Sequence, residues 1–258
     1  MHSAHALAAA DVLVTSLRGD ARVGNAAVKQ LDQLPYQQRI ELADGAQLVL
    51  VDLRSAQQYV VRGPGQYVLE PDGVQPRAGA AVQRKQLPAA YRGIGLDEGK
   101  TTHAGATLRA ADPADSSDWP AFAADQQEER IATRNARLRW PAQPHKGGWQ
   151  LRINELDGTP VYQTTVTPNQ ALLPDTVALA PEHDYRRVLE WRAPGGMVQS
   201  SSVVLRTLSD AQTRQLDALA PVADTSPPER LLYALWLRSL GVRSLAQDHA
   251  CLLHEENC

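Results

Sequence analysis

The chain has 258 residues, of which 43% are hydrophobic and 21% are charged, and its formal net charge is −3. This composition is close to the globular average and excludes a wholly disordered chain. The slightly acidic balance argues against nucleic acid as a partner, because phosphate binding needs a basic face. No run approaches the ~20 apolar residues that span a bilayer, so we expect no direct membrane span.

Residues 1–10, MHSAHALAAA, are small and apolar and contain the A-x-A pattern twice before Asp11. This pattern is typical of the cleavage end of a secretory signal whose basic and hydrophobic regions are missing. We interpret residues 1–10 as a signal-peptide remnant or a disordered segment and expect a periplasmic or otherwise exported protein. An alanine-rich start of a cytosolic protein is the alternative.

Residues 11–110 contain short runs of β-formers, such as VLVTSLRGDARV and RIELADGAQLVLVDL, separated by turn residues. Turn signals at intervals of ~8–12 residues are typical of a β-sandwich, barrel or solenoid. Residues 47–53 are apolar on both faces, which predicts a central strand.

The tripeptide Gly63, Pro64 and Gly65 interrupts this pattern. It cannot lie inside a ladder, because proline has no N–H to donate and glycine allows positive φ. We therefore predict a tight turn that reverses the chain between the strands at residues 59–62 and 66–69.

Several segments together resemble the FecR-type extracytoplasmic domain, above all its stand-alone relatives: Gly19 with residues 23–40, LADGAQLVLVDLRSAQQYVVRGPGQYVLEPDGV, and AGATLRA. The resemblance covers roughly residues 12–110. FecR-type domains in membrane regulators relay a signal by protein contact, so the resemblance implies an interaction role here. The chain lacks the transmembrane helix and anti-sigma segment of those regulators, so control of a sigma factor is not carried over.

Residues 111–132 are acidic at their start and rich in Asp, Pro and Ser, which predicts a linker. Residues 133–207 alternate between polar and apolar positions, as half-buried antiparallel strands do, with a hairpin signal at Asp157-Gly158. Within them, LAPEHDYRRVLEW resembles a fibronectin type III domain. The resemblance implies a corner tyrosine, Tyr185, whose hydroxyl bonds the backbone just upstream. Trp140 is expected to fill the core between the sheets.

Residues 208–258 are predicted to be helical. Ser209 can cap a helix through Leu219, Ser226-Pro227 can begin another, and Gly241 can end it. We expect the two short helices around Gly241 to form a hairpin that packs on the sandwich. The predicted fold class is therefore mainly β: a FecR-like β domain, a fibronectin-III-like sandwich and a C-terminal helical hairpin.

The tail DHACLLHEENC contains the only two cysteines, Cys251 and Cys258. We expect a disulfide between them, provided that the helix frays after His254, because a regular helix would hold their Cα atoms roughly 10 Å apart. Zinc on Cys251, His254 and Cys258 is a weaker alternative, and we expect neither metal nor cofactor.

Reactive motifs are incomplete throughout the chain. The run GIGLDEGKT resembles a phosphate loop, but Ile94 stands where the first glycine is needed. The central histidines, His103 and His183, lie in predicted turns without a nucleophile elbow. Trp119 and Trp149 are the tryptophans expected to be exposed, which would suit a carbohydrate platform.

We therefore expect a non-enzymatic interaction protein that contacts a protein partner through its FecR-like half. Arginine and glutamine suit polar recognition but supply no general base at neutral pH. The candidate contact residues lie around the turns of that half: Arg54, Gln57, Gln58, Arg62 and Gln66. The alternative is a glycan-binding module, or an enzyme whose site is assembled between the two β domains. The oligomeric state stays open.

Overall fold

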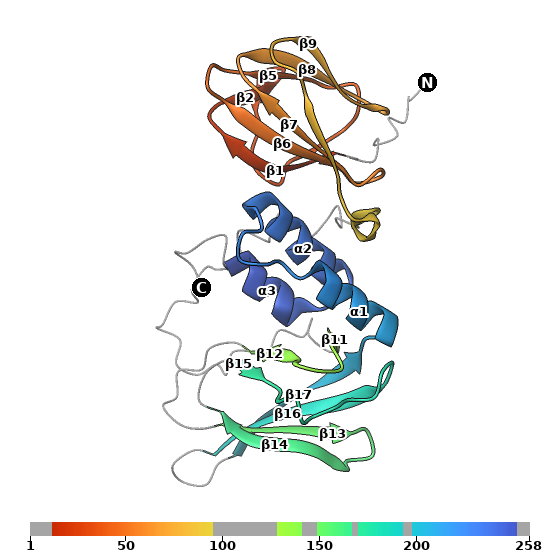
Figure 1. Cartoon of the computed structure of the whole chain (residues 1–258). Coiled ribbons are helices and arrows are strands. Elements are labelled where there is room, and N and C mark those ends of the chain that lie inside the picture. The colour runs from red at the N-terminus through yellow and green to blue at the C-terminus, as the bar shows by residue number, and fades with distance from the viewer. Residues whose placement is uncertain (1–11, 95–127, 141–148, 167–169, 193–197, 252–258) are drawn as a thin grey trace, which may run out of the picture. The chain divides into compact units, whose positions relative to one another are not determined.

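The computed structural model describes residues 12–94, 128–140, 149–166, 170–192 and 198–251 (Figure 1). Its fold is mainly β, with several antiparallel sheets and a helical C-terminal region, as predicted. The chain divides into two compact units. Unit 1 comprises residues 1–95 and 221–236, and unit 2 comprises residues 96–220 and 237–258.

Unit 1 is a sandwich of two antiparallel sheets that enclose one apolar core. The sheet orders are β10-β7-β6-β1-β4 and β3-β2-β5-β8-β9. The strands, in chain order, are β1 (Val12–Arg18), β2 (Ala21–Val23), β3 (Ala26–Ala27), β4 (Gln33–Leu34), β5 (Arg39–Leu42), β6 (Gln47–Asp52), β7 (Gln57–Arg62), β8 (Gly65–Glu70), β9 (Gly73–Ala78) and β10 (Gln83–Gln86).

The central position predicted for residues 47–53 is confirmed, because β6 lies between β7 and β1. Leu48 and Leu50 face the core between the sheets. Val49 and Val51, which alternate with them, are also buried. A strand buried on both faces needs apolar residues at consecutive positions, and the sequence QLVLVD supplies them.

A turn at Gly63 and Pro64 joins the two strands, as predicted, but it does not pair them in one sheet. It joins β7 and β8, which belong to different sheets, so it carries the chain across the sandwich. The Gly63 N–H donates to the Ala46 carbonyl at 2.8 Å, and a Cβ on Gly63 would lie 1.8 Å from the Ala43 oxygen. A Cβ on Gly65 would lie 2.9 Å from the Ala78 oxygen. The glycines are therefore needed for close backbone approach on both sides of the crossing.

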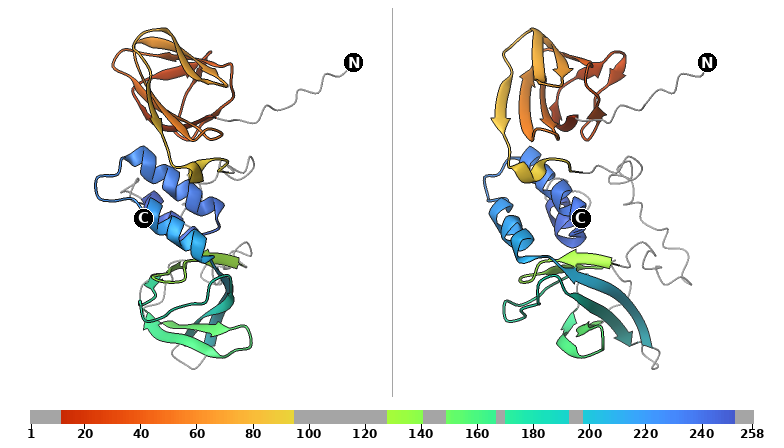
Figure 2. Two further views of the ribbon diagram at one scale, coloured as in Figure 1. Left: turned by 45° about the vertical axis from the view of Figure 1, so that its right-hand side comes forward. Right: turned by 90° about the vertical axis from the view of Figure 1, so that its right-hand side faces the viewer.

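Unit 2 is a second sandwich, with sheet orders β11-β17-β16-β13-β14 and β12-β15 (Figures 1 and 2). Its core takes residues from both sheets, among them Leu138, Leu151 and Leu189, and includes Trp140 as expected. The strands are β11 (Glu128–Ile131), β12 (Arg137–Arg139), β13 (Trp149–Glu155), β14 (Pro160–Val166), β15 (Gln170–Leu172), β16 (Asp184–Arg192) and β17 (Val198–Thr207).

Two expectations for this half are corrected. The segment predicted as a linker contains β11, which pairs in parallel with β17 and buries Ile131. With one strongly apolar residue in EERI, this strand has no alternating pattern to detect. Trp149 is 2% exposed and stacks on Trp191 at 6.2 Å between ring centroids, so it offers no exposed platform.

Three helices follow, and the predicted caps are confirmed. Helix α1 (Asp210–Leu219) begins with a capping box, in which the Gln212 N–H donates to Ser209 Oγ at 3.2 Å. Helices α2 (Pro227–Ser239) and α3 (Arg243–Cys251) are separated by Gly241, whose φ of 82° suits glycine. None of the helices in the described ranges is long and apolar enough to cross a membrane.

The expected packing of the helical hairpin on the second sandwich is only partly right. The unit division falls inside α2, since residues 221–236 belong to unit 1. There Glu229 forms an ion pair with Lys85, and the Trp236 ring meets the Tyr91 ring edge-on at 6.5 Å. Tyr91 belongs to a short 3-10 helix, η1 (Ala89–Tyr91). The spacing of apolar residues along a helix predicts that one face of the helix packs on another element, but it does not identify that element.

Candidate interaction surface

A buried carboxylate organises the turn that carries Arg54. Asp52, 3% exposed, ends β6 and accepts hydrogen bonds from the backbone N–H of Arg54 at 2.9 Å and from Ser55 Oγ at 2.8 Å. Ala56 takes a left-handed φ of 52°, and its carbonyl accepts hydrogen bonds from the Leu87 N–H and from the Gln86 side chain. Hydrogen bonds therefore hold the turn at its start, through the Asp52 carboxylate, and at its end, through the Ala56 carbonyl.

The Arg54 side chain lies over an aromatic ring. Its guanidinium carbon is 4.6 Å from the centroid of the half-buried Tyr36 ring, within cation–π range. Burial, with the negative charge of Asp52, raises the pKa of Tyr36 to about 12, so the phenol is neutral at physiological pH. An exposed arginine, a tyrosine and a buried aspartate are thus brought together from the turn after β6, the segment before β5 and the end of β6.

A second aromatic group borders this turn along β7. The Tyr59 hydroxyl donates to Gln57 Oε1 at 2.7 Å, and the Arg84 guanidinium lies 5.8 Å from the Tyr59 ring centroid. Burial, and then the charge of Asp52, raises the pKa of Tyr59. The charge of Asp52 therefore raises the pKa of both tyrosines. We call Tyr36, Arg54, Gln57 and Arg84 the Arg54 surface.

The structure does not bring the five predicted contact residues into one cluster. Arg62 is exposed at the far end of β7, roughly 16 Å from its start at ~3.3 Å per residue. Gln66 lies on the other sheet and donates to Glu41 Oε1 at 3.2 Å. Gln58 places its Oε1 in a buried position without a hydrogen-bond partner. Arg54 and Gln57 alone share the Asp52 turn.

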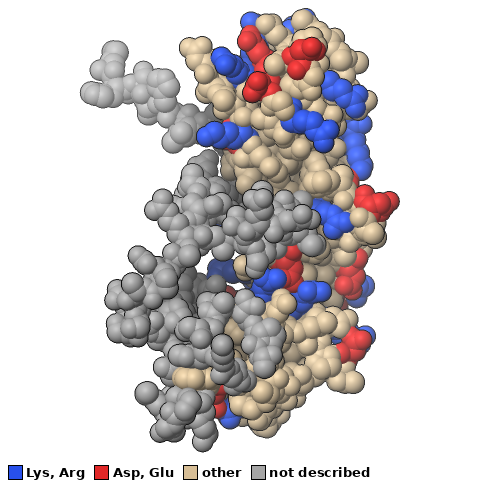
Figure 3. Space-filling model, turned by 90° about the vertical axis from the view of Figure 1, so that its left-hand side faces the viewer, with Lys and Arg blue, Asp and Glu red and all other residues tan. Residues whose placement is uncertain are grey.

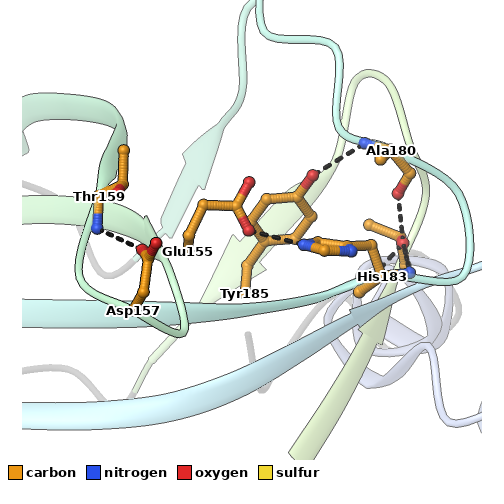
Figure 4. Close-up of polar contacts among 7 residues, drawn as sticks. Glu155, Asp157, Thr159, Ala180, His183 and Tyr185 are labelled. Atoms are coloured by element: carbon orange, nitrogen blue, oxygen red, sulfur yellow. Dashed lines mark hydrogen bonds and ion pairs between the residues drawn. The ribbon is translucent and has the colours of Figure 1, made fainter.

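In unit 2, His183 forms a polar cluster at one end of the sandwich (Figure 4). Its Nε2 lies 2.6 Å from Glu155 Oε2, and its ring meets the Tyr185 ring at 4.8 Å between centroids. The Tyr185 hydroxyl accepts a hydrogen bond from the Ala180 N–H at 2.9 Å, the contact of a corner tyrosine. Thr207 Oγ1 is likewise bonded to backbone, donating to the Ala180 carbonyl.

This cluster has a base but no available nucleophile in the described chain. The nearby hydroxyls of Tyr185 and Thr207 are tied to backbone groups, and Asp157 caps the adjacent hairpin by accepting from the Thr159 N–H at 2.8 Å. That hydrogen bond lowers the pKa of Asp157. The arrangement suits a structural role in shaping the loops at this end of the sandwich.

Sequence reasoning missed a buried charged group in unit 2. Arg187 is 1% exposed. Its Nη1 lies 3.6 Å from Glu129 Oε2 and donates a hydrogen bond to the Arg139 carbonyl at 3.0 Å. Glu129 in turn accepts from the N–H and the hydroxyl of Ser244 at the start of α3. The only signal was that Glu128 and Glu129 must face opposite ways in a strand, and Glu128 is indeed exposed.

The remaining candidate chemistry lies outside the described residues: His103, Trp119, most of the phosphate-loop-like run, and Cys258 with its predicted bond to Cys251. Within the described ranges, no group of three or more His, Cys, Asp or Glu residues could hold a metal ion. On the face seen in Figure 3, basic and acidic side chains are interspersed and do not collect into one basic patch.

Comparison with known proteins identifies no family for the chain. No family model and no curated protein matches it. Among solved structures, CopC from Methylosinus trichosporium OB3b is 13% identical, with a TM-score of 0.26, covering 33% of this chain and 88% of that one. The chicken CNTN1 FN1–FN3 domains are 8% identical, with a TM-score of 0.26, covering 78% of this chain and 58% of that one.

PorZ of Porphyromonas gingivalis, described as a surface component of the type-IX secretion system, is 9% identical, with a TM-score of 0.22. The match covers 73% of this chain and 25% of PorZ, and this chain likewise spans little more than half of the CNTN1 fragment. TM-scores this low carry no argument about fold, activity or partners. The fibronectin-III-like description of unit 2 rests on its strand pairing and its corner tyrosine.

Proposed function

We propose that the chain is an exported, non-enzymatic interaction protein of the bacterial cell envelope. Its unit 1 is a FecR-like domain that binds a protein partner through the Arg54 surface. The observation that carries the proposal is the stacked pair of Arg54 and Tyr36 on a turn held by Asp52. Arginine and tyrosine are enriched among the residues that dominate binding energy at protein interfaces.

Preorganisation supports this choice of surface. The carboxylate of Asp52 fixes the turn, and the ring of Tyr36 limits the rotamers of Arg54 before any partner arrives. A side chain that is ordered in advance loses less conformational entropy on binding. Arg62 has no such support, because it is exposed at the end of its strand. We therefore place the contact at the Asp52 turn and leave the crossing turn at Gly63 outside it.

The resemblance of unit 1 to FecR-type domains supports action by protein contact. The A-x-A residues before Asp11 support export. The described part of the chain supports a non-enzymatic role in one further respect: the hydroxyls next to the His183–Glu155 pair are already engaged with the backbone.

A photo-crosslinking amino acid placed at position 54, in cells that express the gene with its natural upstream codons, tests the proposal. We expect a crosslink to a cell-envelope protein from position 54, on the turn before β7, and none from position 62, a matched exposed arginine at the far end of β7. Purified partner should then bind the Arg54→Gln variant at least about tenfold more weakly than the parent and bind Arg62→Gln normally. Equal loss in both variants, or an uncleaved protein in the cytoplasm, contradicts the proposal.

A further inference from the structure

One edge of the unit 2 sandwich is open to a further strand. β14 is the last strand of the sheet β11-β17-β16-β13-β14, and no strand of the described chain pairs with its outer side. Its sequence, PVYQTTV, carries no charge and is rich in β-branched and aromatic residues. Val161, Gln163 and Thr165 are exposed. Such an edge presents unpaired backbone N–H and C=O groups that can template another strand.

The other sheet edges in the described residues are protected in familiar ways. β10 carries Arg84 and Lys85, β9 contains Pro76 and Arg77, and β11 begins with two glutamates. β3, β4, β12 and β15 are at most three residues long. Charge, proline and shortness each discourage edge-to-edge pairing. β14 is the exception among these edges, which is a reason to assign it a partner.

The register of β14 defines the segment that can pair. Tyr162 to Val166 oppose consecutive residues of β13, while Val161 has no opposite residue because the register shifts there. The regular stretch of five residues is therefore centred on Thr164. Tyr162, Thr164 and Val166 oppose the buried residues Ile153, Leu151 and Trp149, so they share the core face, and Gln163 and Thr165 share the outer face.

We propose that β14 pairs with β14 of a second copy of this chain, antiparallel about a two-fold axis at Thr164. Each pair across that axis is favourable: Tyr162 with Val166, Thr164 with Thr164, and Gln163 with Thr165. Aromatic with β-branched residues and threonine with threonine are stabilising cross-strand pairs. No like charges meet, and the isologous geometry closes after two copies. The two five-stranded sheets become one sheet of ten strands.

The exposed positions Gln163 and Thr165 allow a charge test that is specific for this register, because each would face the other across the axis. Gln163→Lys combined with Thr165→Lys places lysines opposite each other at two points. Gln163→Glu combined with Thr165→Glu does the same with carboxylates. Gln163→Lys combined with Thr165→Glu changes the same two positions but sets opposite charges face to face. All three variants lose the same side-chain hydrogen bonds to Gln150.

Sedimentation velocity of the full chain, carried to near-millimolar concentration, measures the association, since edge pairing buries less than a standard interface and is expected to be weak. The parent should dimerise, the two like-charge variants should associate about tenfold more weakly, and the opposite-charge variant should associate at least as well as the parent. Mixing the two like-charge variants should restore a dimer.

Unchanged thermal midpoints for the three variants at low concentration establish that each is folded. A parent that stays monomeric overturns the proposal and leaves the edge to a different protein. Equal association of all variants places any dimer on another surface and also overturns it. If the like-charge and opposite-charge variants associate equally weakly, the charges do not meet across a two-fold axis at Thr164, and the proposal is wrong.

Discussion

At the scale of single residues, Tyr185 shows how a local sequence pattern acquires its physical meaning. The resemblance of LAPEHDY to a fibronectin type III domain implied a hydroxyl bonded to the upstream backbone, and the structure supplies the partner: the Ala180 N–H, which donates to the phenolic oxygen. The tyrosine is an acceptor here, so its loss orphans a donor. Orphaned backbone N–H groups are rarer in proteins than under-satisfied carbonyls.

Tyr185→Phe should lower the free energy of unfolding by about 1–3 kcal/mol, because Tyr185 is 3% exposed and the Ala180 N–H loses its acceptor. Urea denaturation measures the change. Tyr162→Phe is the control, because it removes a half-exposed hydroxyl from the edge strand β14. Equal midpoints for Tyr185→Phe and the parent would show that the corner bond contributes nothing.

Tyr91 gives a pH dependence of stability. Burial, with the negative charge of Glu229, raises its pKa to about 12 from the ordinary value of about 10. Because the folded pKa lies above the unfolded one, the contribution is fully present below about pH 10 and is lost as the pH rises toward about 12. The Tyr91→Phe variant should therefore lose less stability than the parent across that interval in denaturant titrations. Parallel pH profiles would contradict the assignment.

At the scale of elements, the pair of Glu129 and Arg187 connects β11, β16 and α3. Burial lowers the pKa of Arg187 and the charge of Glu129 opposes that shift, so the carboxylate favours the charged guanidinium. Arg187 Nε and Nη2 have no hydrogen-bond partner. A buried cation with incomplete hydrogen bonding depends strongly on its counter-charge.

Glu129→Gln should therefore destabilise unit 2 by about 3–5 kcal/mol, since it leaves the Arg187 charge buried without compensation. Arg187→Met in the same background should recover part of that loss, giving a double-mutant coupling energy that differs clearly from zero. Chemical denaturation of the parent, both single variants and the double variant measures it. Additive losses would mean that the two groups do not interact.

Elements also show how far the sequence predicts this fold. Local signals were reliable: the capping box at Ser209, the stop at Gly241 and the hairpin at Asp157-Gly158 are all present. Pairing partners were not predictable. The turn predicted at Gly63-Pro64 is present, yet it joins strands of different sheets. A turn motif describes four residues, whereas sheet membership depends on which distant strand covers each apolar face.

For the candidate sites, too, local features could be predicted from the sequence and contacts between distant segments could not. Residue types near the Asp52 turn could be named from sequence, because turns display polar side chains. The stacking of Arg54 on Tyr36 depends on two segments that are far apart in the chain, and the buried Arg187 looked like any polar position of an alternating strand. Contacts of this kind are set by tertiary packing, which single-sequence periodicity does not encode.

At the scale of the whole molecule, the C-terminal segment returns to both units. Residues 221–236 belong to unit 1, where Glu229 pairs with Lys85 and Trp236 meets Tyr91. From Leu237 onward the chain belongs to unit 2, where Ser244 bonds Glu129. Each unit therefore includes residues that follow the strands of both sandwiches in the sequence, so neither sandwich is expected to reach full stability from its own strands alone.

Two truncations separate these contributions. A chain that ends at Ser239 keeps α2 and loses α3, so it should lose amide-exchange protection in β11 and β12 while β6 and β7 stay protected. A chain that ends at Ala220 loses α2 as well, and with it the contacts to Lys85 and Tyr91, so protection should also fall in β6, β7 and β10. Hydrogen exchange with peptide-level mass spectrometry measures both, and a chain that ends at Cys251 is the control. If removal of α3 alone exposes β6 and β7 as much as removal of both helices, stability is not partitioned along the boundary at Trp236.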